Sequence, residues 1–268
     1  MSRGDGSRHP LFYYMGNCIM DSNQYTIKLA GKIVPLKFYY RQTVELYQNF
    51  IQSFYEGNGA IGVSEKEKAI FEENDLGYVW NYRAESKCLA ALISDSFMPY
   101  NRLVFHSVAF FWNGKAWLIT APSGTGKTTQ YRNLKKLYGN RIQIICGDNP
   151  VLHFQDDGII MVYPSPWNGK ENYRGAVAAP LGGIVWLLQN RENNIKRLPP
   201  RDAVVPIFRG INTYSRTPEL VHQMFRLEER MITTVPIWKF ENTGTLTSSK
   251  MLMKCLAEYE KKENHNEL

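Results

Sequence analysis

The sequence feature that most constrains the fold is the glycine-rich stretch APSGTGKTT at positions 121–129, which directly follows the apolar run 116–120. A strand that ends in a glycine-rich turn, followed by a lysine and a helix start, surrounds phosphate groups because it presents free backbone N–H groups to an anion. We therefore expect the backbone from Gly124 to Thr128 to form an anion-binding nest and Lys127 to reach the β- and γ-phosphates of a nucleotide. The alternative is a glycine-rich turn that binds nothing.

The same stretch supplies the predicted cofactor contacts, with one departure from the strict pattern. Ala121 stands where that pattern has its first glycine, a position that needs a small residue. The hydroxyl of Thr128 is placed to bind Mg²⁺, so the predicted cofactors are ATP and Mg²⁺. The predicted nucleotide-binding residues are Ser123, Gly124, Thr125, Gly126, Lys127, Thr128 and Thr129.

The order of the apolar segments predicts an α/β core with a mixed sheet. From residue 103 onward, strand-like runs and helical runs interleave with hairpin signals at Asn113-Gly114 and at 156–158. The expected strands are 103–112, 116–120, 141–146, 151–154, 159–163, 183–188, 195–198 and 235–240. The expected helices are 128–138, 200–208, 217–231 and 248–261.

The chain divides into two parts by pattern. Residues 1–95 mix short alternating segments, such as 24–29, with a predicted helix at 44–55, and form an N-terminal α+β region of unknown role. Within this region the charged segment 65–74 is either a loop or an exposed helix. Residues 96–268 carry the phosphate-loop pattern and form the predicted catalytic domain.

Asp148 is the second residue with predicted chemistry. It follows the apolar run 142–146, at the strand end where a phosphate-loop protein places a carboxylate beside its nucleotide. Such a carboxylate holds Mg²⁺ or takes a proton from an attacking hydroxyl, and the sequence does not separate these two roles. The alternative is that 148–150 is only a turn before the next strand.

Charge and cysteine usage limit the partners and the compartment. Four cysteines lie far apart without paired spacing, the run at 11–20 lacks a cleavage site, and no apolar run is long enough to span a bilayer. We therefore expect a cytoplasmic protein without membrane or nucleic-acid partners. The net charge is +7, and a basic stretch is either a solvated surface, a site for phosphate or an acidic peptide, or a nucleic-acid contact. Its residues are Arg191, Lys196, Arg197, Arg201, Arg209 and Arg216.

Three segments together resemble the catalytic domain of HPr kinase/phosphorylase, which has the phosphoenolpyruvate carboxykinase-like fold. They are FHSVAFFWNG at 105–114, WLITAPSGTGKT at 117–128 and CGDN at 146–149, so that the resemblance covers about residues 95–260. It implies catalytic roles for His106, Lys127 and Asp148, and a homo-oligomer is common in that family. The family's paired aspartates become Asp148-Asn149, and the signature of its phosphorylase activity is not recognisable. The chain also resembles lasso-peptide tailoring kinases, which phosphorylate a serine of a precursor peptide.

Two further elements carry predictions with an open alternative. His106 orients Asp148 or contacts the transferred phosphoryl group, or it is a hydrogen-bonded core residue. The loop 163–171 offers Lys170, with Arg174 beyond it, to the γ-phosphate or the acceptor. Alternatively this loop is a rigid connector whose Trp167 packs on the core.

These patterns predict a Mg-ATP-dependent kinase that transfers a γ-phosphate to a serine hydroxyl of a peptide or protein. Two alternatives remain open. One is a nucleotide-gated binding module without transfer, and the other is a carboxykinase-like enzyme acting on a small molecule.

Overall fold

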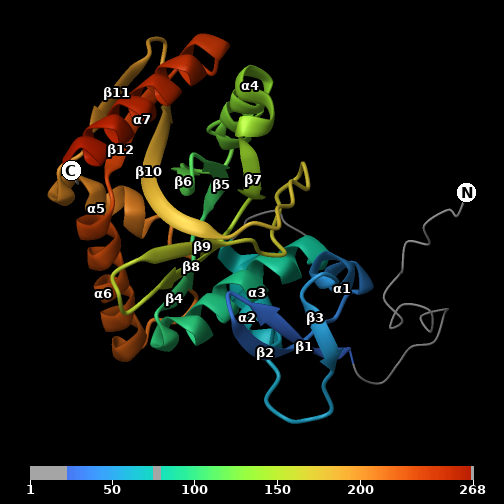
Figure 1. Cartoon of the computed structure of the whole chain (residues 1–268). Helices are drawn as coiled ribbons and strands as arrows, with labels where there is room; N and C mark the ends of the chain where they lie inside the picture. Colours follow the sequence, from blue (N-terminus) through green and yellow to red (C-terminus); the bar gives the residue numbers. More distant parts are fainter. Residues whose placement is uncertain (1–22, 75–79, 267–268) are drawn as a thin grey trace, which may run out of the picture.

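The computed structural model describes residues 23–74 and 80–266, which form two β-sheets with covering helices (Figure 1). The smaller sheet has three strands, all from residues 24–54, and the larger has nine strands, all from residue 102 onward. The molecule is therefore a mixed α/β protein with one large mixed sheet. The run 11–20, Cys18 and the remaining residues before Asn23 lie outside the described part of the chain.

The larger sheet places two strand ends of its central region on the same side. Its strand order is β4-β8-β9-β10-β6-β5-β7, with β12 beside β10 and β11 beside β12. β10 runs parallel to β6 and β12, whereas the other neighbouring pairs are antiparallel. Because β6 and β7 both run antiparallel to β5, their carboxyl ends meet at the same edge. The strands are β4 (Arg102–Val104), β5 (Ser107–Trp112), β6 (Lys115–Thr120), β7 (Gln143–Cys146), β8 (Val151–Phe154), β9 (Ile160–Tyr163), β10 (Ala179–Gln189), β11 (Asn194–Arg197) and β12 (Ile237–Asn242).

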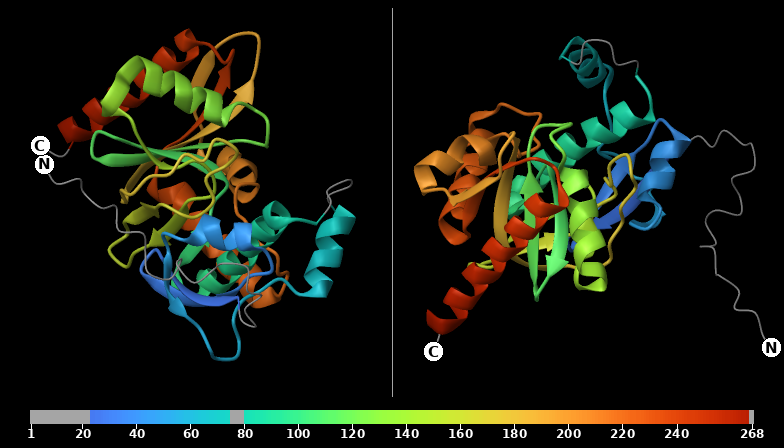
Figure 2. Two further views of the ribbon diagram at one scale, coloured as in Figure 1. Left: turned by 90° about the vertical axis from the view of Figure 1, so that its right-hand side faces the viewer. Right: turned by 90° about the horizontal axis from the view of Figure 1, so that it is seen from above.

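Helices cover both faces of this sheet. Successive residues of a strand point to opposite faces, so Ala109 and Leu118 belong to one core cluster, while Phe110 and Trp117 belong to another. The first cluster packs against α5 and α6, and the second against α4 and α7. The result is a three-layer arrangement (Figure 2). The helices are α4 (Lys127–Tyr138), α5 (Pro200–Phe208), α6 (Pro218–Thr234) and α7 (Leu246–Asn266).

The smaller sheet packs on a core of its own. Its order is β2-β1-β3, and alternate residues of β1 and β2 are buried against α1 and α3. Trp167 and Val151, which are distant in sequence, complete the same cluster. The elements of this region are β1 (Gln24–Leu29), β2 (Lys32–Lys37), α1 (Arg41–Tyr47), β3 (Ile51–Phe54), α2 (Glu65–Asn74) and α3 (Tyr82–Phe97).

The sequence-based expectations fail at three places. The helix expected at 44–55 is α1 followed by β3, because residues 51–54 pair with β1 instead of continuing the helix. The helix α3 was not expected at all. The strand expected at 103–112 is split into β4 and β5. The backbone N–H groups of Phe105 and His106 donate instead to the carbonyls of Pro150 and Gly210, outside the pairing of either strand.

Most other expected elements of the larger sheet are present with boundaries that shift by a few residues. The largest shift is in β10, which begins at Ala179 rather than at 183. The hairpin turn at Asn113 and Gly114 has both residues at positive φ, 51° and 80°, as a two-residue turn of this kind requires. Within residues 23–74 and 80–266, no helix combines the length and apolar character needed to cross a membrane.

Candidate functional site

The glycine-rich stretch forms a turn between the end of β6 and the start of α4. Gly124 and Gly126 adopt positive φ angles of 81° and 102°, and a side chain added at either position would meet open space. Gly126 is the N-cap of α4, and no side chain caps this helix. The amide of Gln130, bonded to Gly126 O at 2.9 Å, begins the regular helical pattern. The preceding amides therefore lack the carbonyls one turn back that a helix interior provides.

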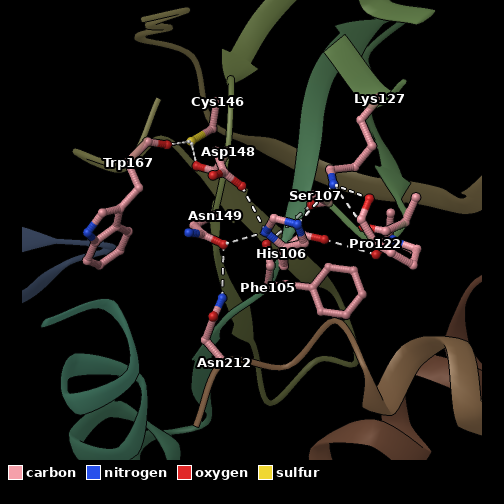
Figure 3. Close-up of polar contacts among 12 residues, drawn as sticks. Phe105, His106, Ser107, Pro122, Lys127, Cys146, Asp148, Asn149, Trp167 and Asn212 are labelled. Carbon is pink, nitrogen blue, oxygen red and sulfur yellow. Dashed lines mark hydrogen bonds and ion pairs between the residues drawn. The ribbon is translucent and has the colours of Figure 1, made fainter. Parts of the chain in front are cut away.

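Lys127 folds back over this turn. Its Nζ lies 2.8 Å from Ala121 O, 3.3 Å from Pro122 O and 2.9 Å from His106 Nε2 (Figure 3). The side chain is buried, and burial lowers the pKa of Lys127, while the negative charge of Asp148 acts in the opposite direction. The three acceptors are uncharged groups of the protein, so none of them neutralises the ammonium.

His106 connects Lys127 to the segment after β7. It lies between β4 and β5, where its backbone N donates to Gly210 O at 2.6 Å and its carbonyl accepts from Thr120 Oγ1 at 2.9 Å. An ammonium only donates, so Nε2 is the acceptor for Lys127 and the proton of a neutral ring resides on Nδ1. The ring is therefore fixed at both nitrogens.

Nδ1 of His106 faces two oxygens. Asn149 Oδ1 lies at 3.2 Å and Asp148 Oδ1 at 3.0 Å (Figure 3). The first contact is a hydrogen bond. The second has the distance of an ion pair without a hydrogen bond, so Asp148 Oδ1 is a buried acceptor that no donor of the described chain satisfies. The side chain of Asp148 as a whole is 28% exposed. Because Oδ1 itself is buried against the imidazole, the exposed part of the carboxylate is the part suited to receive a proton or a cation.

Asn149 and Asn212 complete this network and were not recognised as site residues from sequence. Asn149 has φ +52°, and its Oδ1 also accepts from Asn212 Nδ2 at 2.9 Å. Asn212 lies between α5 and α6, in a segment fixed by Asp95 of α3, which accepts from Thr213 Oγ1 at 2.7 Å and from Ser215 N at 2.6 Å. The departure at Asn149 from a paired aspartate was visible in the sequence, whereas Asn212 carried no local signal.

The loop after β9 supports the segment that carries Asp148. Gly147 N donates to Tyr173 O at 2.9 Å, and Cys146 forms an isolated bridge with Arg174. A side chain at Gly147 would come within 2.5 Å of Asn168 O, so only glycine permits this close approach. Cys146 Sγ is buried against Asp148 O, at 2.6 Å, and Trp167 O, at 3.2 Å, and burial raises the pKa of this thiol to about 12.

The two predicted substrate residues of this loop differ in position. Lys170 is exposed, and Arg174 is partly buried with its Nε 2.8 Å from Asn172 Oδ1. Trp167 packs in the N-terminal core and donates from Nε1 to Ser86 O at 3.0 Å, as the connector alternative expected. All six residues of the basic stretch between Arg191 and Arg216 are exposed.

The residues predicted for magnesium form a partial ligand set. No group of three or more His, Cys, Asp and Glu side chains suited to a metal occurs among residues 23–74 and 80–266. The hydroxyl of Thr128, at the start of α4, and the partly exposed carboxylate of Asp148 both offer oxygen, which Mg²⁺ prefers as a ligand. Since Mg²⁺ is commonly held by one or two protein oxygens together with substrate phosphates, this pair fits a magnesium–nucleotide complex.

Comparisons with known proteins give little beyond this geometry. No protein-family model matches the sequence, and no curated protein matches it. Among solved structures, the chain is similar to the HPr(Ser) kinase/phosphatase from Coxiella burnetii, with a TM-score of 0.35 and 11% sequence identity. That alignment covers 60% of this chain and 98% of the other. The likeness is too low to carry a functional argument, which therefore comes from the site itself.

Proposed function

We propose that this protein is a Mg-ATP-dependent kinase that transfers the γ-phosphate of ATP to a serine hydroxyl of a peptide or protein. The observation that carries the proposal is the chain of contacts from Lys127 through His106 to Asp148, built across the uncapped start of α4. One end of this chain is the buried ammonium of Lys127 at the uncapped start of α4, and the other is the partly exposed carboxylate of Asp148. Phosphoryl transfer requires these two features, charge neutralisation and proton acceptance, at one place.

The phosphate end of the site has a direct structural basis. The amides at the start of α4 and the neighbouring glycines would bind the β- and γ-phosphates, as at other helix N-termini. Lys127 is held by neutral acceptors and would exchange them for phosphate oxygens, so that its charge offsets the charge of the transferred group. Ser123, Thr125 and Thr129 belong to the same turn and first helical turn and would line the nucleotide.

The carboxylate end would handle the acceptor. As the serine oxygen bonds to the γ-phosphorus and the bond from that phosphorus to the β–γ bridging oxygen breaks, the hydroxyl proton passes to the Asp148 carboxylate and ADP leaves. His106 Nδ1, held by Asn149, would orient that carboxylate. Thr128 and Asp148 would hold Mg²⁺, which would neutralise part of the phosphate charge. A lasso-peptide precursor is one acceptor of this kind.

Substitution of Asp148 by asparagine tests the proposal. We expect Asp148→Asn to bind a fluorescent ATP analogue within a few-fold of the wild-type affinity, and to transfer phosphate at least ~100-fold more slowly, because an amide does not accept the proton. Transfer is measured with ATP labelled at the γ-phosphate and serine-containing peptides, followed by mass spectrometry. Asp156→Asn, in the exposed turn between β8 and β9, is the matched control and should behave as wild type.

Two results would count against the proposal. An unchanged transfer rate in Asp148→Asn removes the assignment of this carboxylate. Binding of ATP by the wild-type protein without phosphate transfer to any peptide favours instead the nucleotide-gated module, in which binding only shifts the conformation.

A further inference from the structure

A polar groove lies where the N-terminal region meets the loop that supports Asp148. Its volume is about 500 Å³, and its lining comes from α1, from the first residue of α3 and from the segment after β9. The lining residues are Gln42, Glu45, Leu46, Gln48, Tyr82 and Arg174. The proposed phosphate and proton-transfer groups are not part of this lining, so the groove is a separate feature of the molecule.

The side of α1 that faces away from the N-terminal core lines the groove. Gln42, Glu45 and Leu46 have the spacing of one helical face, whereas Val44 and Tyr47 are buried in the N-terminal core. Gln42 and Glu45 are exposed and Leu46 is partly buried. This face therefore combines an amide and a carboxylate with some apolar surface.

Arg174 connects the groove to the site. Its backbone is bridged to Cys146, two residues before Asp148, and the preceding residue, Tyr173, accepts from Gly147 N at 2.9 Å. The loop is also tied to α4 by the ion pair between Glu171 and Arg132, at 2.9 Å. The backbone of this loop passes between β7 and α1 (Figure 1). A ligand that contacts Arg174 in the groove would thus lie against the same short segment that positions the proton acceptor.

The chemistry of the lining matches an extended peptide with a carboxylate. The glutamine amides can donate to and accept from a peptide backbone, and Tyr82 and Leu46 offer apolar contact. Arg174 uses Nε for Asn172, which leaves the outer edge of its guanidinium for a bidentate contact to a carboxylate. The Glu45 carboxylate forms an ion pair with Arg41 at 3.3 Å. Its negative charge is therefore shared with Arg41 and does not fully neutralise Arg174.

The geometry points to this groove as the binding site for an extended segment of the acceptor peptide, with a carboxylate of that segment on Arg174. The inference rests on the kinase activity proposed above and specifies the acceptor: a peptide with an acidic residue or its C-terminal carboxylate at a fixed distance from the phosphorylated serine. The N-terminal region thereby gains a role, as one wall of the acceptor site.

The experiment measures acceptor selectivity with the full chain. Synthetic peptides carrying a single serine, with Asp, Glu, Gln or Lys at each other position, are offered with labelled ATP, in free-acid and C-terminally amidated forms. We expect the wild-type enzyme to phosphorylate the preferred acidic peptides about tenfold faster than their neutral counterparts, and Arg174→Glu to abolish this preference. Amidation distinguishes a C-terminal carboxylate from an acidic side chain.

Two further variants separate the groove from a general charge effect. Glu45→Lys adds positive charge to the groove and should strengthen the acidic preference, and since Glu45 is exposed the fold is not at risk. Arg141→Glu carries the same charge change as Arg174→Glu at an exposed position between α4 and β7 and should leave selectivity unchanged. Thermal unfolding of each variant verifies its folding.

The outcomes distinguish the groove from the kinase activity. If the wild-type enzyme phosphorylates peptides without a carboxylate preference, or if Arg174→Glu retains that preference, the groove assignment is overturned and the kinase activity stands. If the wild-type enzyme binds ATP and phosphorylates no peptide, the kinase proposal fails and the groove assignment fails with it.

Discussion

The N-termini of α3 and α4 differ in whether a side chain of the protein caps the helix. Every helix begins with backbone N–H groups that have no partner within the helix. At α3, Asn81 Oδ1 accepts from Arg83 N at 2.9 Å and from Ala84 N at 3.3 Å. At α4, the N-cap is Gly126, which has no side chain to offer. The start of α3 is therefore capped by a side chain of the protein, whereas the start of α4 has no side-chain cap.

The carboxylates beside the two helices differ in the same way. Glu85, in the first turn of α3, accepts from Tyr39 N at 2.5 Å, from Tyr40 N at 3.2 Å and from the Thr43 hydroxyl. Asp148, near the start of α4, keeps an oxygen that no donor of the described chain satisfies. The buried Glu85 carboxylate uses its oxygens to hold the chain in place, whereas the side chain of Asp148 is 28% exposed and remains accessible to a ligand. This contrast agrees with the proposal that nucleotide binds at α4, and it assigns a structural role to the start of α3.

Placing an anion at the start of α4 should produce the largest effect. In Gly126→Asp, the carboxylate would occupy the position proposed for phosphate and repel the nucleotide, so we expect the affinity for ATP to fall by about 100-fold. Titration with a fluorescent ATP analogue measures this loss.

Gly158→Asp is the matched control for that substitution. Gly158 has φ +90° and open space at its Cβ position, so it carries a similar backbone cost and the same charge in the β8–β9 turn. It should lower stability without changing nucleotide affinity. An equal loss of ATP affinity in both variants would contradict the proposal that phosphate binds at Gly126.

Removing the saturated carboxylate should affect stability instead. Glu85→Ala leaves three donors without their acceptor, one of them fully buried, and we expect a loss of about 3 kcal/mol in the free energy of unfolding at acidic pH, or roughly 8 °C in Tm, with unchanged ATP affinity. Burial raises the pKa of Glu85 above its ordinary value of 4.5, so its contribution is full below that value and declines as the pH rises through the folded-state pKa. The difference in Tm between wild type and Glu85→Ala should therefore become smaller as the pH is raised from mildly acidic to neutral. A difference that widens with pH would contradict this assignment.

The smallest effect is expected for the cap of α3. Asn81→Ala removes the acceptor for two helix amides and should cost about 1 kcal/mol, or roughly 3 °C in Tm. Asn81→Asp keeps an acceptor and should retain most of the stability. A reduced ATP affinity in Asn81→Ala would contradict the separation of the two regions.

Local patterns were sufficient to predict most of the larger sheet. The hairpin at Asn113-Gly114, the stop of α4 at Gly139 and the proline start of α5 are each determined by residues within a few positions of the element. The turn at 121–126 and the start of α4 were predictable from the glycine-rich stretch because they too depend only on nearby residues. His106, Lys127 and Asp148 were named in advance, and the structure brings them into one chain of contacts.

Elements that depend on distant partners were not predictable in this way. Residues 51–54 have helical spacing and become β3 because β1 offers a strand edge. Asn212 reaches the site only because Asp95, more than a hundred residues earlier, fixes the segment after it. Such contacts arise from tertiary packing, which overrides local propensity and leaves no periodic signal in the sequence.

The buried thiol of Cys146 provides a reporter of motion beside Asp148. With a pKa raised to about 12, almost none of it is thiolate at neutral pH, and its contacts with Asp148 O and Trp167 O shield it from reagents. Alkylation therefore requires that this strand end separates from the loop, and the alkylation rate measures how often it does. Saturating the protein with nucleotide and repeating that measurement would show whether nucleotide in the glycine-rich turn slows the local opening at the end of β7.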